Sequence, residues 1–186
     1  SLLRRKKYPN AIIYAFEPLN DAYFQLISHF EDDSNFFAKN VALGNENKTI
    51  DFIKSSRKSS SSVLHLAGSH KSAFPDSAIE TTQKIEIMKL DDYFINSERQ
   101  IKKDLIIKID VQGYEYEVIL GGTRTIKKAK AVICEVSFEE LYINQKLFKD
   151  VLDLLTNYGF QFKGVIDQIY HPENGMILQA DAVFEK

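Results

Sequence analysis

Two carboxylates stand at the ends of apolar runs, where side chains are placed to do chemistry. Asp110 ends the run LIIKID at residues 105–110, and the run AVICEV at residues 131–136 closes on a carboxylate, Glu135. Apolar runs of this length are typical of buried strands in parallel sheets, and ligands of open α/β sheets bind just beyond the carboxyl ends of such strands. Gly113 would let the backbone after Asp110 approach a ligand closely. We therefore expect Asp110 to lie at a ligand site.

The predicted strands that carry Asp110 and Glu135 should be neighbours, which leaves two kinds of chemistry for the pair. The two carboxylates would hold a hard divalent cation such as Mg²⁺. Alternatively, they would act as catalytic residues that orient a substrate hydroxyl and take its proton. For Glu135, a structural contact with a nearby lysine or backbone donor is a further alternative, and the sequence leaves all of these open.

Glu17 stands at the end of another apolar run, residues 11–16, directly before Pro18. Proline cannot donate a ladder hydrogen bond, so the predicted strand stops there. In nucleotide-binding α/β folds, an acid at such a strand end accepts hydrogen bonds from both ribose hydroxyls, and a carboxylate offers two oxygens for them. The alternative interpretation is an acid at a helix N-terminus, stabilised by the helix dipole.

Further candidates lie on either side of these strand ends. Glu115 falls in the first turn of a predicted helix, where the dipole stabilises a carboxylate. His65 lies in a serine-rich segment, residues 57–77, that has no clear periodicity and is interpreted as a long loop. A histidine that titrates near neutrality would serve as a general base on a sugar hydroxyl, although a solvated loop histidine is the alternative.

The elements that must position these residues alternate between strands and helices. Strands are predicted at residues 11–16, 36–43, 49–53, 84–88, 105–111, 131–136, 160–166 and 176–184. Helices are predicted to follow the first strand, to begin at residue 90, to end at residues 121–122 and to cover residues 148–158. The alternation indicates a single α/β domain, residues 1–186, with a mostly parallel sheet, and the last two strands indicate a closing antiparallel hairpin.

Composition excludes several classes of function. The 186 residues carry a net charge of −2, so the chain lacks the basic excess that nucleic-acid binding requires. No apolar stretch approaches the roughly 18 residues that span a membrane. Cys134 is the single cysteine, so no intrachain disulfide forms, and a reducing cytoplasm is the expected compartment.

Several segments together resemble a known family in order and spacing. They are YAFEP at 14–18, NVALGN at 40–45, KLDDY at 89–93, KIDVQGYEYEVILGG at 108–122, ICEVS at 133–137 and QADAVFEK at 179–186. They are similar to the FkbM family of S-adenosylmethionine-dependent methyltransferases along nearly the whole chain. The K-I-D-V-x-G-x-E core is the most specific element, and Gln112 replaces the glutamate that is usual in the family.

The resemblance implies a class I methyltransferase fold, S-adenosylmethionine as cofactor, and O-methylation of a hydroxyl on a sugar or glycosylated small molecule. Glu17 would bind the ribose of the cofactor. Asp110 would lie near its methionine end and the reacting hydroxyl, and Glu115 would belong to the same acidic motif. Three residues would lie at the adenine: Asn40, Val41 and Ala42.

The family pattern begins with a strand and a glycine-rich loop, and none of the eight glycines falls at the corresponding place near the N-terminus. We therefore expect this first strand and loop to be missing. The vacated slot would then be filled by another segment or by another chain, as in a homodimer, or the sheet would rearrange, because a vacated slot exposes unpaired backbone groups. A non-enzymatic remnant that binds a partner or self-associates is the alternative function. A nicotinamide-dependent oxidoreductase is a third, against which the absent G-x-G-x-x-G motif counts.

Overall fold

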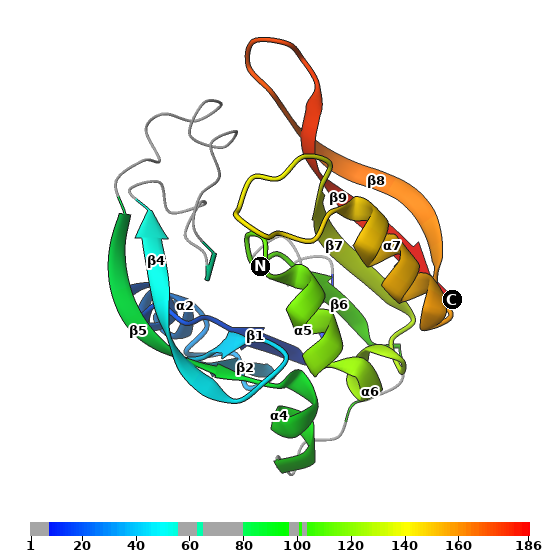
Figure 1. Ribbon diagram of the computed structural model, residues 1–186. Coiled ribbons are helices and arrows are strands. Elements are labelled where there is room, and N and C mark those ends of the chain that lie inside the picture. The colour runs from blue at the N-terminus through cyan, green and yellow to red at the C-terminus, as the bar shows by residue number, and fades with distance from the viewer. Residues whose placement is uncertain (1–7, 56–62, 65–79, 97–100, 102–103) are drawn as a thin grey trace.

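The computed structural model describes residues 8–55, 63–64, 80–96, 101 and 104–186, and it shows a mixed α/β arrangement (Figure 1). The strands are β1 (Ile13–Phe16), β2 (Phe36–Lys39), β3 (Ala42–Leu43), β4 (Lys48–Ser55), β5 (Glu80–Met88), β6 (Ile106–Ile109), β7 (Ala131–Ser137), β8 (Gln161–Tyr170) and β9 (Ile177–Glu185). The helices are α2 (Asn20–His29), α4 (Leu90–Asn96), α5 (Glu115–Gly121), α6 (Thr123–Ile126) and α7 (Phe148–Asn157).

Within the described residues the strands form three small sheets rather than one. Their orders are β1-β2, β3-β5-β4 and β6-β7-β9-β8. The pairs β1–β2, β3–β5 and β6–β7 are parallel, whereas β4–β5, β7–β9 and β8–β9 are antiparallel. The prediction of a mostly parallel sheet is therefore wrong. Strand–helix alternation reveals crossover connections, but it does not reveal antiparallel neighbours that need no crossover.

The predicted antiparallel hairpin of the last two strands is confirmed. Both β8 and β9 join the sheet, and β9 lies between β7 and β8. The predicted strand at residues 36–43 is divided into β2 and β3, because the Val41 N–H turns back to the Lys39 carbonyl. β7 extends to Ser137, so Glu135 lies inside the strand rather than at its end.

The main hydrophobic core lies between the β6-β7-β9-β8 sheet and the helices α5, α6 and α7, which cover one face of that sheet (Figure 1). Alternate residues of β7 contribute to it: Val132 and Cys134 are fully buried, whereas Ile133 and Glu135, which alternate with them, are only partly buried. Successive side chains of a strand point to opposite faces. Glu135 therefore lies on the face of the sheet that these helices do not cover.

α5 ends at the glycine pair 121–122, as the sequence predicts, and Gly121 makes a tight contact there. A Cβ added to Gly121 would lie 1.8 Å from the carbonyl oxygen of Gly44, so no larger residue fits between α5 and the segment after β3. α5 follows the strand-end loop directly, and this close packing fixes the helix against its neighbours.

No helix among the residues described here is long and apolar enough to cross a membrane.

Candidate functional site

The loop between β6 and α5, residues 110–114, forms the centre of the candidate site. Two successive residues adopt positive φ angles, Gln112 at 56° and Gly113 at 96°. A Cβ at position 113 would lie 2.7 Å from the ring of the buried Tyr142, so only glycine fits this turn. A non-glycine residue in the left-handed region is strained by about 1 kcal/mol or more, which marks Gln112 as a constrained position.

Glu115 supports this loop from within the protein. Its carboxylate accepts hydrogen bonds from the backbone N–H of Val111 at 3.0 Å and from the N–H of Gly113 at 3.1 and 3.0 Å. Burial raises the pKa of Glu115 to about 7, even though these hydrogen bonds act to lower it. Its predicted contribution to cofactor binding would therefore act through the shape of the loop, and it stays a prediction.

Lys108 balances part of the charge beside the loop. Its Nζ contacts Asp181 Oδ2 at 2.7 Å and Oδ1 at 2.9 Å, and it reaches Asp110 Oδ2 at 3.1 Å. Burial acts to lower the pKa of Lys108, but the hydrogen bond with Asp181 and the charge of Asp110 raise it above its ordinary value. The single ammonium group is thus shared between two carboxylates.

The structure brings Asp110 and Glu135 together, as the sequence predicted, and a third side chain bridges them. Gln112 Nε2 donates to Asp110 Oδ1 at 3.0 Å and to Glu135 Oε2 at 2.8 Å. Gln179 Nε2 donates to the same oxygen of Glu135 at 3.0 Å. The structural contacts of Glu135 are therefore with two amides rather than with a lysine.

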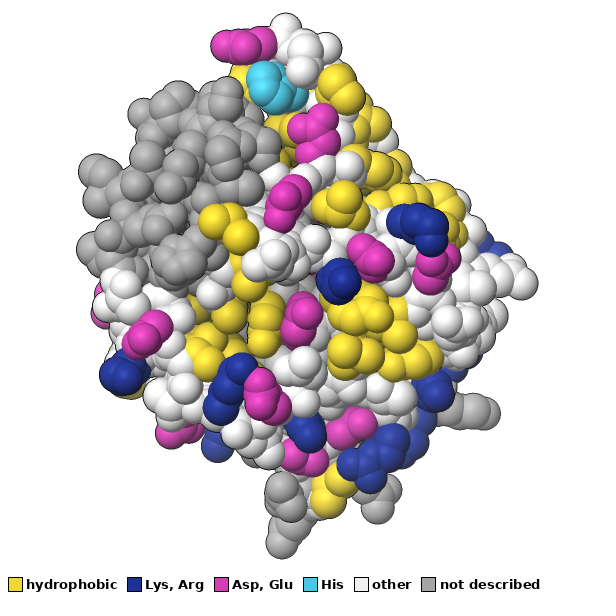
Figure 2. Space-filling model, viewed as in Figure 1, with side chains coloured by type: hydrophobic (Ala, Val, Ile, Leu, Met, Phe, Trp, Pro, Cys, Tyr) yellow, Lys and Arg dark blue, Asp and Glu magenta, His cyan; other side chains and the backbone are white. Residues whose placement is uncertain are grey.

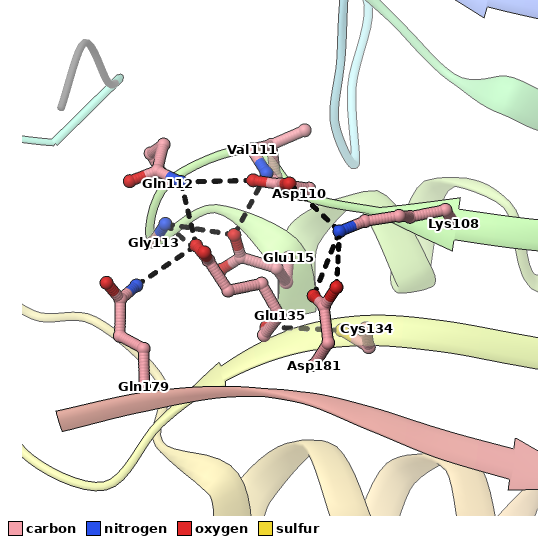
Figure 3. A network of polar contacts seen from close by, with 10 residues as sticks. All are labelled: Lys108, Asp110, Val111, Gln112, Gly113, Glu115, Cys134, Glu135, Gln179 and Asp181. Atoms are coloured by element: carbon pink, nitrogen blue, oxygen red, sulfur yellow. Dashed lines mark hydrogen bonds and ion pairs between the residues drawn. The ribbon is translucent and has the colours of Figure 1, made fainter. Parts of the chain in front are cut away.

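These residues form one network, shown in Figure 3, in which carboxyl groups outnumber the ammonium group of Lys108. We call it the carboxylate network; its charged members are Lys108, Asp110, Glu115, Glu135 and Asp181. Burial, together with the neighbouring carboxylates, raises the pKa of Glu135 to about 8, and Lys108 offsets this only in part. A carboxyl group whose pKa lies near neutrality is suited to proton transfer.

A hollow beside the carboxylate network is lined by residues of the β6-β7-β9-β8 sheet and of the loop after β6. Its volume is about 110 Å³, below the roughly 300–1,000 Å³ of most ligand sites, so it would admit only part of a ligand. Its wall consists of Lys108, Asp110, Glu135, Asp167, Gln168, Ile169, Gln179, Ala180 and Asp181. Among the described residues of that wall, Lys108 is the only basic one.

Glu17 and Asn40 join the ends of β1 and β2. The Leu19 N–H donates to Glu17 Oε1 at 2.9 Å, and no described residue donates to Oε2. Burial raises the pKa of Glu17, and the hydrogen bond from Leu19 offsets this in part. Asn40 Nδ2 donates to the carbonyl oxygens of Glu17 at 2.9 Å and Pro18 at 3.2 Å. Within the described residues, the second carboxylate oxygen of Glu17 therefore accepts no hydrogen bond.

Val41 and Ala42, the other residues predicted at the adenine, are buried, with 4% and 8% of their surface exposed. Ala42 belongs to a second hydrophobic cluster that also contains Tyr114, and Leu19 and Val111 pack against it. The cluster therefore links the turn after β1, the strand β3 and the loop after β6. It ties the Glu17 side of the site to the Asp110 side.

His65 lies outside the described residues, as does most of the segment 57–77, so its predicted catalytic role stays a prediction. No group of three or more His, Cys, Asp or Glu side chains within the described residues is arranged to hold a metal ion. The Mg²⁺ hypothesis thus gains no support from the pair Asp110 and Glu135. On the face drawn in Figure 2, the described basic side chains are interspersed with acidic and hydrophobic ones and do not gather into one patch.

Sequence reasoning missed two members of the network, Gln179 and Asp181, and gave Lys108 no role. A signal for them exists, because in β9 these polar residues alternate with the buried Ala180 and Ala182. The alternation places Gln179 and Asp181 on the same face of the sheet as Glu135, since Asp181 is the register partner of Glu135. What the sequence did not give was the pairing of β9 with β7.

Comparison with known proteins decides the family. The sequence profile of the methyltransferase FkbM domain matches residues 2–162. This chain belongs to the FkbM methyltransferase family. The resemblance expected from the sequence is thereby confirmed, whereas the missing N-terminal strand and loop stay a prediction.

The comparisons also match this FkbM-family chain with one curated protein and align it with one solved structure. The 2-O-methyltransferase NoeI of Sinorhizobium fredii (strain NBRC 101917 / NGR234) is 30% identical over 156 residues, which are 81% of this chain and 63% of that protein. The chain thus spans less than two thirds of the length of this relative. The crystal structure of methyltransferase FkbM from Methylobacillus flagellatus KT aligns with a TM-score of 0.49 and 12% identity, over 93% of this chain and 36% of that one.

Proposed function

We propose that this chain is an S-adenosylmethionine-dependent O-methyltransferase that acts on a hydroxyl of an uncharged sugar or glycosylated small molecule. The observation that carries the proposal is the setting of Glu135. Its carboxyl group has a pKa near 8, lies beside the strand-end Asp110 and faces a hollow. Family membership supports methyl transfer as the reaction.

The chemistry of the described residues fits the cofactor at two points. The Oε2 atom of Glu17, which no described residue engages, suits the donors of a ribose. Asp110 and the rest of the carboxylate network provide an excess of negative charge where a cationic sulfonium would be favoured. When bound, S-adenosylmethionine supplies a methyl group that its sulfonium has already activated.

The task left to the protein is to align the acceptor and to remove one proton. Glu135, in its ionised form, would accept the hydroxyl proton as the acceptor oxygen forms its bond with the methyl carbon and the bond from that carbon to sulfur breaks. A base with a pKa near the working pH combines availability with driving force. The rigid loop at residues 110–114 would hold the reacting groups in line, which accounts for much of the gain in such reactions.

The charge of the hollow supports an uncharged acceptor. Among the described residues that line it, Lys108 is the one cation, and Asp110 and Asp181 already engage it, so none of these residues offers a ligand a free positive charge. The remaining polar groups are mostly hydrogen-bond acceptors, which sugar hydroxyls satisfy as donors. A carboxylate or phosphate on the sugar would meet repulsion instead. The name of the relative NoeI, a 2-O-methyltransferase, supports a hydroxyl acceptor.

The first experiment titrates the chain with S-adenosylhomocysteine by calorimetry. We expect saturable binding, and a folded chain that does not bind would contradict the proposal. The second measures transfer of a labelled methyl group to three matched acceptors: methyl α-glucoside, its 6-phosphate and its uronic acid. The uncharged glycoside should be methylated with a kcat/KM at least about tenfold higher than either anion. Equal rates for all three would refute the acceptor class while leaving the methyltransferase in place.

A self-associating or partner-binding module is the second candidate function. The observation in its favour is a group of apolar side chains exposed on β8 and on the turn before β9: Ile166, Ile169, Tyr170 and Met176. Exposed apolar patches mark interaction surfaces in many proteins. Concentration-dependent dimerisation in sedimentation experiments, without affinity for S-adenosylhomocysteine, would favour this candidate. A monomer at all concentrations would remove the predicted homodimer.

A further inference from the structure

Two side chains donate hydrogen bonds to Oε2 of Glu135, whereas no residue that the structure describes donates one to Oε1. Gln112 and Gln179 both donate to Oε2, at 2.8 and 3.0 Å (Figure 3). The two amides come from opposite sides, one from the loop after β6 and one from β9. Such an arrangement fixes the carboxyl plane and distinguishes two chemically equivalent oxygens.

The orientation of the Gln112 amide is itself determined by a neighbour. The Tyr142 hydroxyl donates to Gln112 Oε1 at 2.9 Å, and burial raises the pKa of Tyr142, so the hydroxyl keeps its proton. With its oxygen engaged, the amide must turn its two N–H groups toward Asp110 and Glu135. Gln179 has only 6% of its surface exposed, so its side chain is also confined.

We propose that Gln112 and Gln179 are positioning residues: together they hold Oε2 of Glu135 and leave Oε1 as the oxygen that receives the proton of the acceptor hydroxyl. The inference rests on the proposed function and adds two residues to it. Hydrogen bonds donated to a carboxylate favour its ionised form over its protonated form. The two amides therefore counter the burial and the repulsion from Asp110, Glu115 and Asp181 that favour protonation.

The test removes one donor and keeps the volume. Gln179→Met replaces the amide with an unbranched side chain of similar size, which cores usually tolerate. Gln168→Met is the matched control, because Gln168 lines the same hollow from the neighbouring strand β8 but does not donate to Glu135. The carboxyl ¹³C signals of the ligand-free chain are titrated by NMR, and the signal lost in Glu135→Gln identifies Glu135.

We expect Gln179→Met to move the titration midpoint of Glu135 upward by about one pH unit, the scale of a hydrogen bond to a charged group. Gln168→Met should leave the midpoint where it is in the wild type. The acid limb of the pH profile of kcat should move upward with the midpoint in Gln179→Met. An unmoved midpoint in Gln179→Met, or an equal movement in Gln168→Met, would overturn the inference.

A second variant guards against misfolding of the first. Gln112→Met keeps a non-glycine residue at the positive φ angle, so the backbone strain is unchanged, and it should move the Glu135 midpoint in the same direction. The NMR titration needs neither cofactor nor acceptor. If the wild type transfers no methyl group at any pH, the proposed function fails by that result, and the titration still decides whether the amides hold Glu135. If both Met variants titrate like the wild type, the inference fails while the methyltransferase stands.

Discussion

The two ends of the candidate site are supported in different ways. The Asp110 and Glu135 end is built on the β6-β7-β9-β8 sheet, whose core includes the fully buried Ile119, Val132 and Leu155. The Glu17 end is built on β1 and β2, where every residue of β1 is partly exposed and α2 contributes no buried residue. Three hydrogen bonds position Glu17: its carboxylate accepts one from the Leu19 N–H, its carbonyl oxygen accepts one from Asn40, and its own N–H donates to the Lys39 carbonyl.

The difference separates two tasks of the site. Proton transfer demands accurate placement of a few atoms, and such placement is best secured by a packed core. Holding one end of a cofactor demands less, because the ligand itself adds contacts when it binds and stabilises the state that binds it. We therefore expect changes at the Glu135 end to affect turnover and changes at the Glu17 end to affect cofactor affinity.

The largest effect should follow Glu135→Gln. The amide keeps the size of the side chain and an oxygen for Gln112 and Gln179, but it cannot accept a proton as a carboxylate does. Turnover should fall by about 10²–10⁴-fold, the usual share of general base catalysis. Labelled methyl transfer measures it, with S-adenosylhomocysteine affinity as the control that should not change. Turnover close to that of the wild type would show that the base lies elsewhere.

The next prediction compares how much stability is lost when a leucine is truncated in each half of the chain. Leu155→Ala removes a side chain with 0% exposure from the main core and should lower the free energy of unfolding by about 2–5 kcal/mol. Leu26→Ala makes the same change on α2, where no residue is buried, and should cost about 1 kcal/mol. Urea unfolding monitored by circular dichroism measures both. Equal losses would mean that the two halves are equally well packed and that the comparison fails.

A smaller effect is expected at the cofactor. Glu17→Ala should weaken S-adenosylhomocysteine binding by about 1–3 kcal/mol, the scale of a lost hydrogen bond to a charged group. At saturating cofactor, turnover should stay near that of the wild type. Asp21→Ala provides the control, because Asp21 is an exposed acid in the first turn of α2. If calorimetry gives Glu17→Ala the affinity of the control, the ribose role is excluded.

The last prediction concerns how the stability of the chain changes with pH. Glu135 has a pKa of about 8 in the folded chain against 4.5 ordinarily, so folding favours its protonated form. The stability from this group is therefore fully present below 4.5 and is lost as the pH rises to about 8. Wild-type stability should decline across that window, and Glu135→Gln should decline less. Urea midpoints at several pH values measure this, and parallel declines would show that Glu135 is not the group responsible.

The sequence predicted the elements whose pattern is local. β7, α7 and the β8–β9 hairpin occur where apolar periodicity and turn residues indicated them, and the strand-end position of Asp110 is confirmed. The sheet order was not predicted, because strand pairing is decided by contacts between distant segments. Lys108 and Asp181, for example, are 73 residues apart and meet only when β9 inserts beside β7.

The same limit applies to the side chains of the candidate site. That Asp110 and Glu135 would be neighbours followed from two adjacent strands, and this was foreseen. That Gln112 would bridge them did not follow, because its orientation depends on the positive φ angle of the loop and on the Tyr142 hydroxyl. Hydrophobic periodicity does not indicate a strained backbone or a buried hydrogen-bond partner. The family resemblance identified Gln112 only as a replacement for the usual glutamate.

Cys134 gives the core a chemical reporter of its own. The thiol is fully buried directly behind Glu135, and burial together with the surrounding carboxylates raises its pKa well above the ordinary value. Alkylating reagents attack the thiolate, so the folded chain should resist them. Because this is the single cysteine and it lies in the main core, every alkylation event records an opening of that core. The alkylation rate of Cys134 therefore measures how often the half of the chain that holds the carboxylate network opens.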